Sequence, residues 1–460
     1  MRDYFIRRLL LVPITLFGIT LIAFTLTRVA PGGPLEVALM QAAMGGDGEA
    51  ARSARDQQGS LSPTQLQRLE EDYKYDKPIL IAYFQWLGVL PSETRRTRGR
   101  LEPLAATPAA AEAEAAAEAD PGPPPEPGAV ARAEVILPAT VEPLTVWQFD
   151  TGRVDFAAGT DPETLAAWDV RLESADNQRQ RYMDRLRIDR LPEGVEFHDQ
   201  VVAYQSRHLG LFQGYLGRSL FYNIPVWDMM KQRMPISIFF GLTSTLLIYG
   251  ICIPLGIVKA IRHRTMLDTT SSVVIFVGYA IPGFVLGAFL LVIFAARLNW
   301  FPIEGFVSPE FATLSLGGKI LDLAHHAVLP LICYVVSGFA MLTMLVKNNL
   351  MDNLAADYVR TAIAKGVGHK GAIFGHALRN SMIPVATTLG EIITLFVAGN
   401  LLVERVFDID GFGLLMFNAL LQRDQTIVIG VLTVAALLML LGNILSDIIV
   451  ASIDPRIRFK

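Results

Sequence analysis

The sequence predicts an all-α membrane protein with six transmembrane helices and a large, partly disordered segment between the first and second helices. Of the 460 residues, 52% are hydrophobic and 18% are charged, whereas a soluble chain carries about 25% charged residues. The hydrophobic residues gather in six stretches almost free of charge, each long enough to cross a bilayer core, which takes about 20 helical residues. This pattern excludes a soluble enzyme with one large core. The expected spans are Leu9–Thr27, Met234–Val258, Thr269–Ala296, Leu323–Val346, Asn380–Val403 and Gln425–Ser446.

The first stretch is expected to be an uncleaved transmembrane helix, so that residues 1–30 form the N-terminus and the first span. It follows Arg2, Arg7 and Arg8, as a signal peptide would. However, its apolar run exceeds the roughly 7–15 residues of a signal-peptide core, and no small-x-small cleavage pattern follows it.

The distribution of Lys and Arg predicts the orientation of the spans. The termini and the loops on their side carry 14 of these residues, and the short loops on the opposite side carry four, namely Arg297, Lys319, Arg405 and Arg423. Because cytoplasmic loops are enriched in Lys and Arg, both termini are expected in the cytoplasm. We therefore predict a multi-pass protein of the bacterial inner membrane with residues 31–233 outside and residues 234–460 forming the transmembrane core.

The expected outer segment is uneven in composition. Residues 63–90 are predicted to be helical and interfacial, because Tyr73, Tyr83 and Trp86 are typical of a membrane surface. Residues 101–143 hold 14 Ala and 9 Pro, with eight acidic residues against one base, which predicts disorder. Residues 144–200 contain a charged helical run near 164–190. They indicate a small folded element, a segment that orders against a partner, or a solvent-facing insertion without chemistry.

Several function classes find no support in the composition. The net charge of −4 gives no basic field for nucleic acid. We find no phosphate-binding Gly-x-x-x-x-Gly-Lys-Ser/Thr motif, no catalytic constellation and no metal-ligand spacing; His325 and His326 are adjacent but lack a carboxylate cluster. The chain is therefore expected to bind no cofactor or metal and to catalyse no reaction.

The loop between the fourth and fifth expected spans, residues 347–380, carries the most informative pattern. Val359, Ala362, Ile363 and Gly366 recur at helical spacing, and glycines then interrupt the helix. A second short helix places Ile373, Phe374, Ala377 and Leu378 on one side, and His369, Lys370, His376 and Arg379 on the other. Two short helices with small residues and neighbouring cations suggest a docking element for another protein. An ordinary basic cytoplasmic loop is the alternative interpretation.

This loop resembles the EAA loop of ATP-binding-cassette importer permeases, in the form found in the dipeptide, oligopeptide and nickel permease family. There the segment reads Tyr-Val-Arg-Thr-Ala-x-Ala-Lys-Gly and then Ile-x-x-His-Ala-Leu-Arg-Asn, which here are Tyr358–Gly366 and Ile373–Asn380. Arg360 and Arg379 stand at the glutamate and proline positions of the general motif. Further similar segments are Tyr4–Pro34, Tyr75–Pro78, Gly278–Pro282, Val403–Phe407, Gly411–Leu415 and Asp454–Arg458.

The resemblance implies a type I importer fold and a permease subunit that forms half of a peptide translocation pathway, with microcin C-like peptides among the implied substrates. The implied partners are a second homologous permease, two ATPase subunits that use ATP and Mg²⁺, an extracytoplasmic peptide-binding protein and the lipid membrane. The loop would couple to the ATPases around residues 352–380. The residues expected to do so are Asp357, Tyr358, Arg360, Thr361, Ala362, Lys365, Gly366, His376 and Arg379.

Glu391 is the one ionisable residue deep in an expected span. A charge at the bilayer centre costs about 2.5–3.5 kcal/mol on insertion scales, so Glu391 should face protein or water. It either lines the translocation pathway or is a protonated or hydrogen-bonded packing residue. Three other functions stay open: a permease of the same family for nickel or another solute, a proton-driven secondary transporter, and a sensor that signals through the loop.

Overall fold

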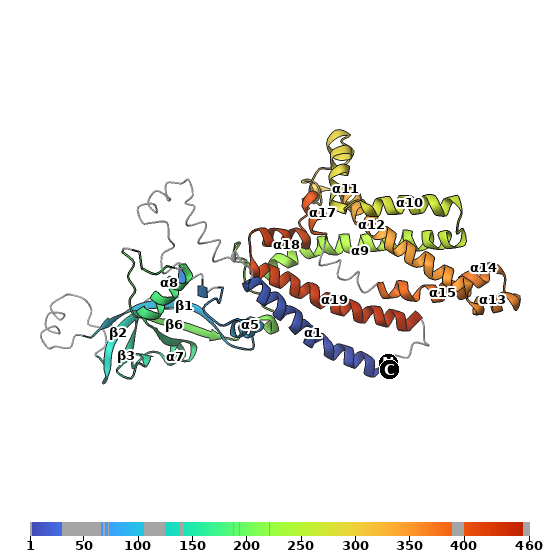
Figure 1. The fold of residues 1–460 in the computed structure, drawn as a ribbon. Coiled ribbons are helices and arrows are strands. Elements are labelled where there is room, and N and C mark those ends of the chain that lie inside the picture. Colours follow the sequence, from blue (N-terminus) through green and yellow to red (C-terminus); the bar gives the residue numbers. More distant parts are fainter. Residues whose placement is uncertain are drawn as a thin grey trace. The chain divides into compact units, whose positions relative to one another are not determined.

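The computed structural model describes residues 2–29, 66–67, 70–71, 73–104, 125–138, 142–186, 188–192, 194–219, 221–388 and 400–453. The chain divides into two compact units (Figure 1). The first unit consists of residues 1–31 and 216–460, and the second consists of residues 32–215.

The first unit is helical. Its elements are α1 (Arg2–Val29), α9 (Val226–Ile261), α10 (Met266–Ala280), α11 (Gly283–Leu290), η2 (Leu291–Arg297), η3 (Phe311–Thr313), α12 (Leu316–Ala355), α13 (Asp357–Ala364), α14 (His369–Gly371), η4 (Ala372–Ala377), α15 (Leu378–Ser381), α17 (Leu401–Val406), α18 (Phe412–Leu421) and α19 (Gln425–Ile453).

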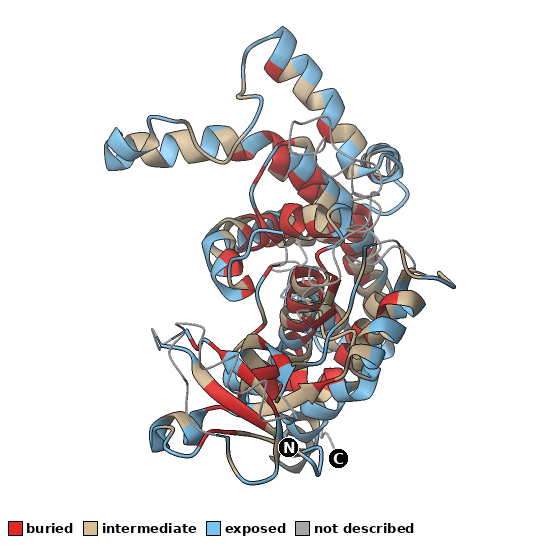
Figure 2. Ribbon diagram, turned by 90° about the vertical axis from the view of Figure 1, so that its left-hand side faces the viewer, coloured by how far each residue is buried: buried red, intermediate tan, exposed pale blue. Residues whose placement is uncertain are grey.

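Within the described residues, four helices are long and apolar enough to cross a membrane, and one bent helix pair adds a further candidate. The four are α1, α9, α12 and α19, and large apolar side chains on them are exposed, as lipid contact requires (Figure 2). The predicted membrane protein with several apolar helices is thus confirmed, but the count of six is not. Much of the fifth expected span, Asn380–Val403, lies outside the described residues.

The third expected span is not one continuous helix. α10 and the α11–η2 segment meet at an angle of 93°, and Pro282 is the residue that precedes α11. Proline donates no backbone hydrogen bond and its ring clashes with the preceding turn, so the helix ends before Pro282 and restarts after it.

The two ends of the first unit's chain are held together by α1 and α19, which lie side by side (Figure 1). Arg8 forms an ion pair with Asp447 and also donates a hydrogen bond to the carbonyl oxygen of Asn443 at 3.0 Å. At the other end of α1, Gln425 donates a hydrogen bond to the carbonyl oxygen of Thr27. Polar contacts therefore fix α1 against α19 at both ends of the pair.

The prediction that the whole chain is α-helical is wrong, because the second unit contains a six-stranded antiparallel sheet. The strand order is β4-β3-β2-β1-β6-β5, and the outer strands β4 and β5 approach one another, so that the sheet nearly closes. The elements are α5 (Ile79–Leu87), β1 (Ser92–Pro103), β2 (Ala129–Val135), β3 (Leu144–Phe149), β4 (Val154–Phe156), α7 (Pro162–Ala167), β5 (Asp169–Glu173), α8 (Ala175–Leu186), β6 (Gln200–Arg207) and η1 (Leu211–Gln213).

Strand β2 lies inside the segment 101–143 that composition predicts to be disordered. Along Ala129–Val135, Ala131, Ala133 and Val135 are buried and the residues between them are more exposed, the period of two that a half-buried strand requires. Small alanines suit this crowded interior, and the prediction of disorder is wrong for β2 and for the end of β1. Residues 105–124 of that segment lie outside the described residues.

The interior of the sheet is filled by apolar side chains, including Val146, Phe156, Trp168 and Val201. The helical prediction near 164–190 is met in part, since strand β5 separates α7 from α8. The aromatic residues of 63–90 do not all face outward as predicted. Tyr83 is fully buried and stacks on Trp86.

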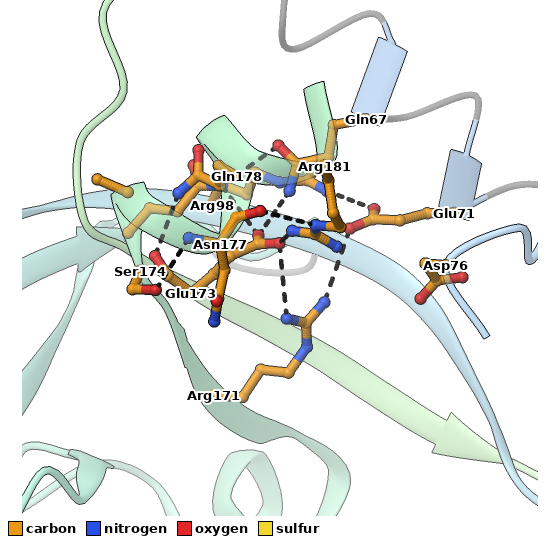
Figure 3. A network of polar contacts seen from close by, with 12 residues as sticks. Gln67, Glu71, Asp76, Arg98, Arg171, Glu173, Ser174, Asn177, Gln178 and Arg181 are labelled. Carbon is orange, nitrogen blue, oxygen red and sulfur yellow. Dashed lines mark hydrogen bonds and ion pairs between the residues drawn. The ribbon is translucent and has the colours of Figure 1, made fainter. Parts of the chain in front are cut away.

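A network of charges fixes β5, β1 and α8 to one another (Figure 3). Glu71 is almost fully buried and pairs with Arg98, while Glu173, equally buried, pairs with Arg181. Burial alone would raise the pKa of Glu173, but the hydrogen bond and charge of Arg181, together with Arg171, hold that pKa below its ordinary value. The carboxylate is therefore ionised and stabilising at neutral pH.

Candidate functional site

The first short helix of loop 347–380, α13, ends in a geometry that requires glycine. Gly366 has a φ of +90°, and its N–H donates to the carbonyl of Ile363 at 2.9 Å while the N–H of Val367 donates to that of Ala362 at 3.1 Å. These two bonds form a Schellman motif, in which a left-handed residue satisfies the last carbonyls of a helix. Gly366 therefore ends α13 at its C-terminus.

The second short helix consists of α14, η4 and α15. Ala372, Ile373 and Ala377 are buried, in agreement with the predicted inner face for Ile373 and Ala377. Phe374 differs from the prediction, since 55% of its surface is exposed. Its exposure follows from the π-helical turn η4, which adds a residue to the turn and so rotates the side chains relative to an α-helix.

The loop is seated on the ends of α9 and α12. A cluster of buried residues joins the three parts: Ala260 of α9, Leu350 of α12, Val359 of α13, and Ala372 and Ala377 of η4. Three of the five are alanines, so the backbones approach closely. The loop is therefore an ordered element with its own small core and with a defined exposed surface.

The structure places the predicted coupling residues on this exposed surface. Asp357, Tyr358, Arg360, Thr361, Lys365, Gly366, His376 and Arg379 are exposed, and Ala362 is half-buried. Asp357 and Arg360 form an ion pair at 3.7 Å, but both are largely in solvent, where such pairs contribute at most about 1 kcal/mol. Tyr358 donates a hydrogen bond to Asn353 at 2.6 Å.

Apolar side chains accompany these polar residues on the same loop. Tyr358, Ile363 and Phe374 are each at least 40% exposed, and nothing lies within 4 Å of the position that a Cβ on Gly366 would occupy. These exposed apolar side chains and the open space beside Gly366 are accessible to another protein. Glu391, the other predicted site residue, lies outside the described residues.

Next to the seat of the loop lies a buried ionic cluster, Lys259, Asp268 and Lys347, that sequence reasoning missed. The Nζ atom of Lys347 lies 2.7 and 2.8 Å from the two carboxylate oxygens of Asp268. Lys259, which is fully buried, lies 3.1 Å from the same carboxylate. Sequence reasoning used both lysines only as markers of orientation, and it started the third span one residue after Asp268.

A second missed group explains two of the family-like segments, Val403–Phe407 and Gly411–Leu415. Glu404 is buried, accepts a hydrogen bond from the backbone N–H of Leu414 at 2.8 Å and from the hydroxyl of Tyr334 at 3.3 Å. A Cβ on Gly411 would lie 2.6 Å from a carboxylate oxygen of Glu404. The glycine and the glutamate are therefore one packing unit, which the spacing of the two segments could have indicated.

These features define a multi-pass helical membrane protein that presents an ordered loop beside the ends of two long helices. Residues 252–459 match the family described as the binding-protein-dependent transport system inner membrane component. The chain belongs to this family of ABC-transporter permeases, as the sequence predicts. Members are the membrane components of their transporters and not the catalytic subunits.

Three relatives illustrate the similarity. The inner membrane ABC transporter permease protein YejB of Escherichia coli O157:H7 is 42% identical over 247 residues, or 53% of this chain and 68% of the relative. The peptidoglycan transport system permease protein YejB of Agrobacterium fabrum is 39% identical over 262 residues, or 55% and 72%. The oligopeptide transport system permease protein AppB of Bacillus subtilis is 33% identical over 304 residues, or 66% and 91%. The resemblance to importer permeases predicted from the sequence is thereby confirmed, and two of these relatives carry the name YejB.

Proposed function

We propose that this chain is a permease subunit of an ATP-driven peptide importer and forms half of its translocation pathway. The names of the relatives support the substrate class, since they describe transport of oligopeptides and of peptidoglycan. The second half of the pathway would come from a homologous permease, and an extracytoplasmic binding protein would deliver the peptide. The Lys and Arg bias supports an orientation with both termini and loop 347–380 in the cytoplasm.

Loop 347–380 is proposed to receive the ATPase subunits, which would bind ATP and Mg²⁺ themselves. The observation that carries this proposal is that Tyr358, Ile363 and Phe374 are each exposed on a loop whose other side is seated on α9 and α12. A surface that is both ordered and apolar gives a partner a rigid contact. Closure of the ATPases would then move the seat and the ends of both helices as one body.

The relatives' names indicate two kinds of transported substrate, free oligopeptides and peptides attached to cell-wall sugars. Both share a peptide backbone, so one pathway could pass either. The nickel and proton-driven alternatives find less support. The three relatives carry names of peptide or peptidoglycan systems or of an ABC permease, and membership of an ABC family argues for ATP as the energy source.

The test is reconstitution of this chain with a second permease, two ATPase subunits and a binding protein of the same transporter. ATP-dependent accumulation of a labelled tetrapeptide or of a labelled muropeptide is expected, and a proton gradient without ATP should drive neither. Accumulation by this chain alone, or by the complex under a proton gradient only, would refute the proposal. The ATPase subunits should also co-purify with the chain.

A further inference from the structure

The ionic cluster joins α10 to the two helices that seat loop 347–380. Lys259 is adjacent in sequence to Ala260, and Lys347 precedes Leu350 by three residues; Ala260 and Leu350 both belong to the buried cluster under the loop. Asp268 lies in the first turn of α10, and no residue of α10 is among those that make up that cluster. The charges therefore connect α10 to the helices that carry the loop's seat, in addition to the short turn of residues 262–265 that joins α9 to α10.

The cluster is closely built. Lys259 donates hydrogen bonds at 2.8 Å to the carbonyl oxygen of Asp268 and to the hydroxyls of Ser271 and Ser272. Arg264 donates its backbone N–H to the Asp268 carboxylate at 3.2 Å, and the ring of His263 lies 3.3 Å from it. Nearly all of the hydrogen-bonding capacity of Lys259 is thus directed at the first two turns of α10.

Along its middle, α10 stands away from its neighbours. A cleft of about 920 Å³ separates it from α9 and α12. Its lining is apolar and includes Ile251, Pro254 and Val258 of α9, Val274 and Ile275 of α10, and Phe339 of α12. At its other end, α10 approaches α12 again, where Gly278 lies against Val336, and then the chain bends by 93° into α11. α10 is therefore held by polar contacts at its first two turns and by close packing at Gly278, and the cleft lies along one of its faces.

We propose that Lys259, Asp268 and Lys347 are positioning residues that transmit movement of the loop's seat to α10, and that this movement sets the width of the cleft. The inference rests on the proposed function. Apolar helix contacts can slide, but a buried carboxylate cannot leave its ammonium partners without exposing unpaired charges to a medium of low polarity. The first turn of α10 must then follow the ends of α9 and α12, while the bend at Pro282 absorbs the change in direction.

The variants can be ranked by the ion pairs that each one leaves in the cluster. Asp268→Asn leaves two buried ammonium groups facing each other without a carboxylate, so it should weaken the connection most, although the hydrogen bonds of Lys259 to the Asp268 carbonyl, Ser271 and Ser272 can remain. Lys347→Gln keeps the pair of Asp268 with Lys259 and should weaken the connection only partly. Arg262→Gln is the matched control, because Arg262 is an exposed cation at the same end of α9 and no hydrogen bond or ion pair of the cluster involves its side chain.

The experiment uses the complete reconstituted transporter with Cys252 and Cys333 replaced by alanine and spin labels at Leu246 of α9 and Val277 of α10, both exposed. In the parent protein, a non-hydrolysable ATP analogue should change the distance between the labels. In Asp268→Asn most of the change should be lost, and substrate-stimulated ATP turnover should fall by about tenfold, within the usual range of coupling between sites. Lys347→Gln should lie between the two, and Arg262→Gln should match the parent.

An unchanged nucleotide-dependent distance shift in Asp268→Asn or in Lys347→Gln would overturn the inference. Lys347→Gln keeps the test valid if Asp268→Asn does not assemble, because the remaining pair keeps α10 in place. Failure of the inference is distinguishable from failure of the proposed function. If the parent transporter shows no stimulated turnover, the function is wrong, whereas a parent that couples beside a variant that moves normally contradicts only the role of the cluster.

Discussion

Substitutions of Gly366 separate two roles that the structure gives to this residue. Its φ of +90° ends α13, and the open space beside it leaves room for a partner. The first role depends on the backbone and the second on the absence of a side chain. Alanine and asparagine affect these roles differently, because asparagine tolerates the left-handed conformation and alanine does not.

The expected magnitudes follow from the seat of the loop. A left-handed alanine costs about 1–2 kcal/mol, equivalent to about a 5- to 30-fold change in a two-state population. The buried side chains of Val359 and Leu350 each stabilise the seated loop by about 1.5–3 kcal/mol. Because their combined contribution exceeds the strain, Gly366→Ala should leave the loop seated in most molecules.

Gly366→Asn keeps the helix end but fills the open space with a polar side chain. If an ATPase contacts this space, the added atoms cost about 1–3 kcal/mol of overpacking in the docked state, and desolvation of the amide adds to that cost. We therefore expect Gly366→Asn to lose substrate-stimulated ATP turnover more severely than Gly366→Ala. Gly366→Leu, which combines strain and bulk, should assemble with the ATPases and show no stimulation.

Two assays are needed. Hydrogen exchange of peptides from 357–380 reports the loop itself and should rise in Gly366→Ala but not in Gly366→Asn. ATP turnover with and without loaded binding protein reports coupling. Gly317→Asn is the control, because Gly317, in the first turn of α12, is equally open. Normal coupling in Gly366→Asn would refute the docking role and leave Gly366 as a helix terminator only.

Three further variants test other parts of the chain. Because Arg181 and Arg171 hold the pKa of Glu173 below its ordinary value of 4.5, its stabilisation is complete above about pH 4.5 and is lost as the pH falls through the lower folded value. Glu173→Gln should therefore speed hydrogen exchange of β5 and β6 at pH 7, and the difference from the parent should shrink in acid; a constant difference contradicts this. Gly411→Ala should lower thermal stability by about 1–3 kcal/mol, because its Cβ would meet Glu404, and an unchanged melting temperature would show that the segment adjusts freely. Glu391→Gln should slow uptake of cationic peptides if Glu391 lines the pathway, and equal uptake defeats that role.

The four long helices α1, α9, α12 and α19 could be predicted from the sequence, because each contains a long apolar stretch. Their true lengths could not. α12 has 40 residues and is about 60 Å long at 1.5 Å per residue, about twice the bilayer core. Its polar C-terminal turns carry the loop's seat and have no apolar signal. The bend before Pro282 was signalled by the proline, but the angle depends on how α11 packs against α12 and α17.

The sheet of the second unit was missed for a different reason. Counting Ala, Pro and acidic residues over 101–143 averages the alternating strand β2 together with its surroundings, and β1, the strand beside β2, lies across the acidic and Pro-rich stretch between them. Leu101 of β1 pairs with Ala133, and β1 also pairs with β6 across 100 residues or more. Long-range pairing of this kind leaves only a short local signal, here the alternation of Ala131, Ala133 and Val135.

The part of the candidate site that could be predicted consists of exposed residues that lie close together in the sequence. The loop's two helices, its glycine stop and its cations follow from spacing, whereas the ionic cluster requires three helices to meet. Lys259 and Lys347 were counted among 14 cations that fix the orientation, yet both are buried against Asp268. Without these two lysines, the predicted cytoplasmic side still carries 12 Lys and Arg residues against four on the opposite side. The orientation therefore does not depend on the cluster, and Asp268→Asn should alter coupling without inverting the chain in the membrane.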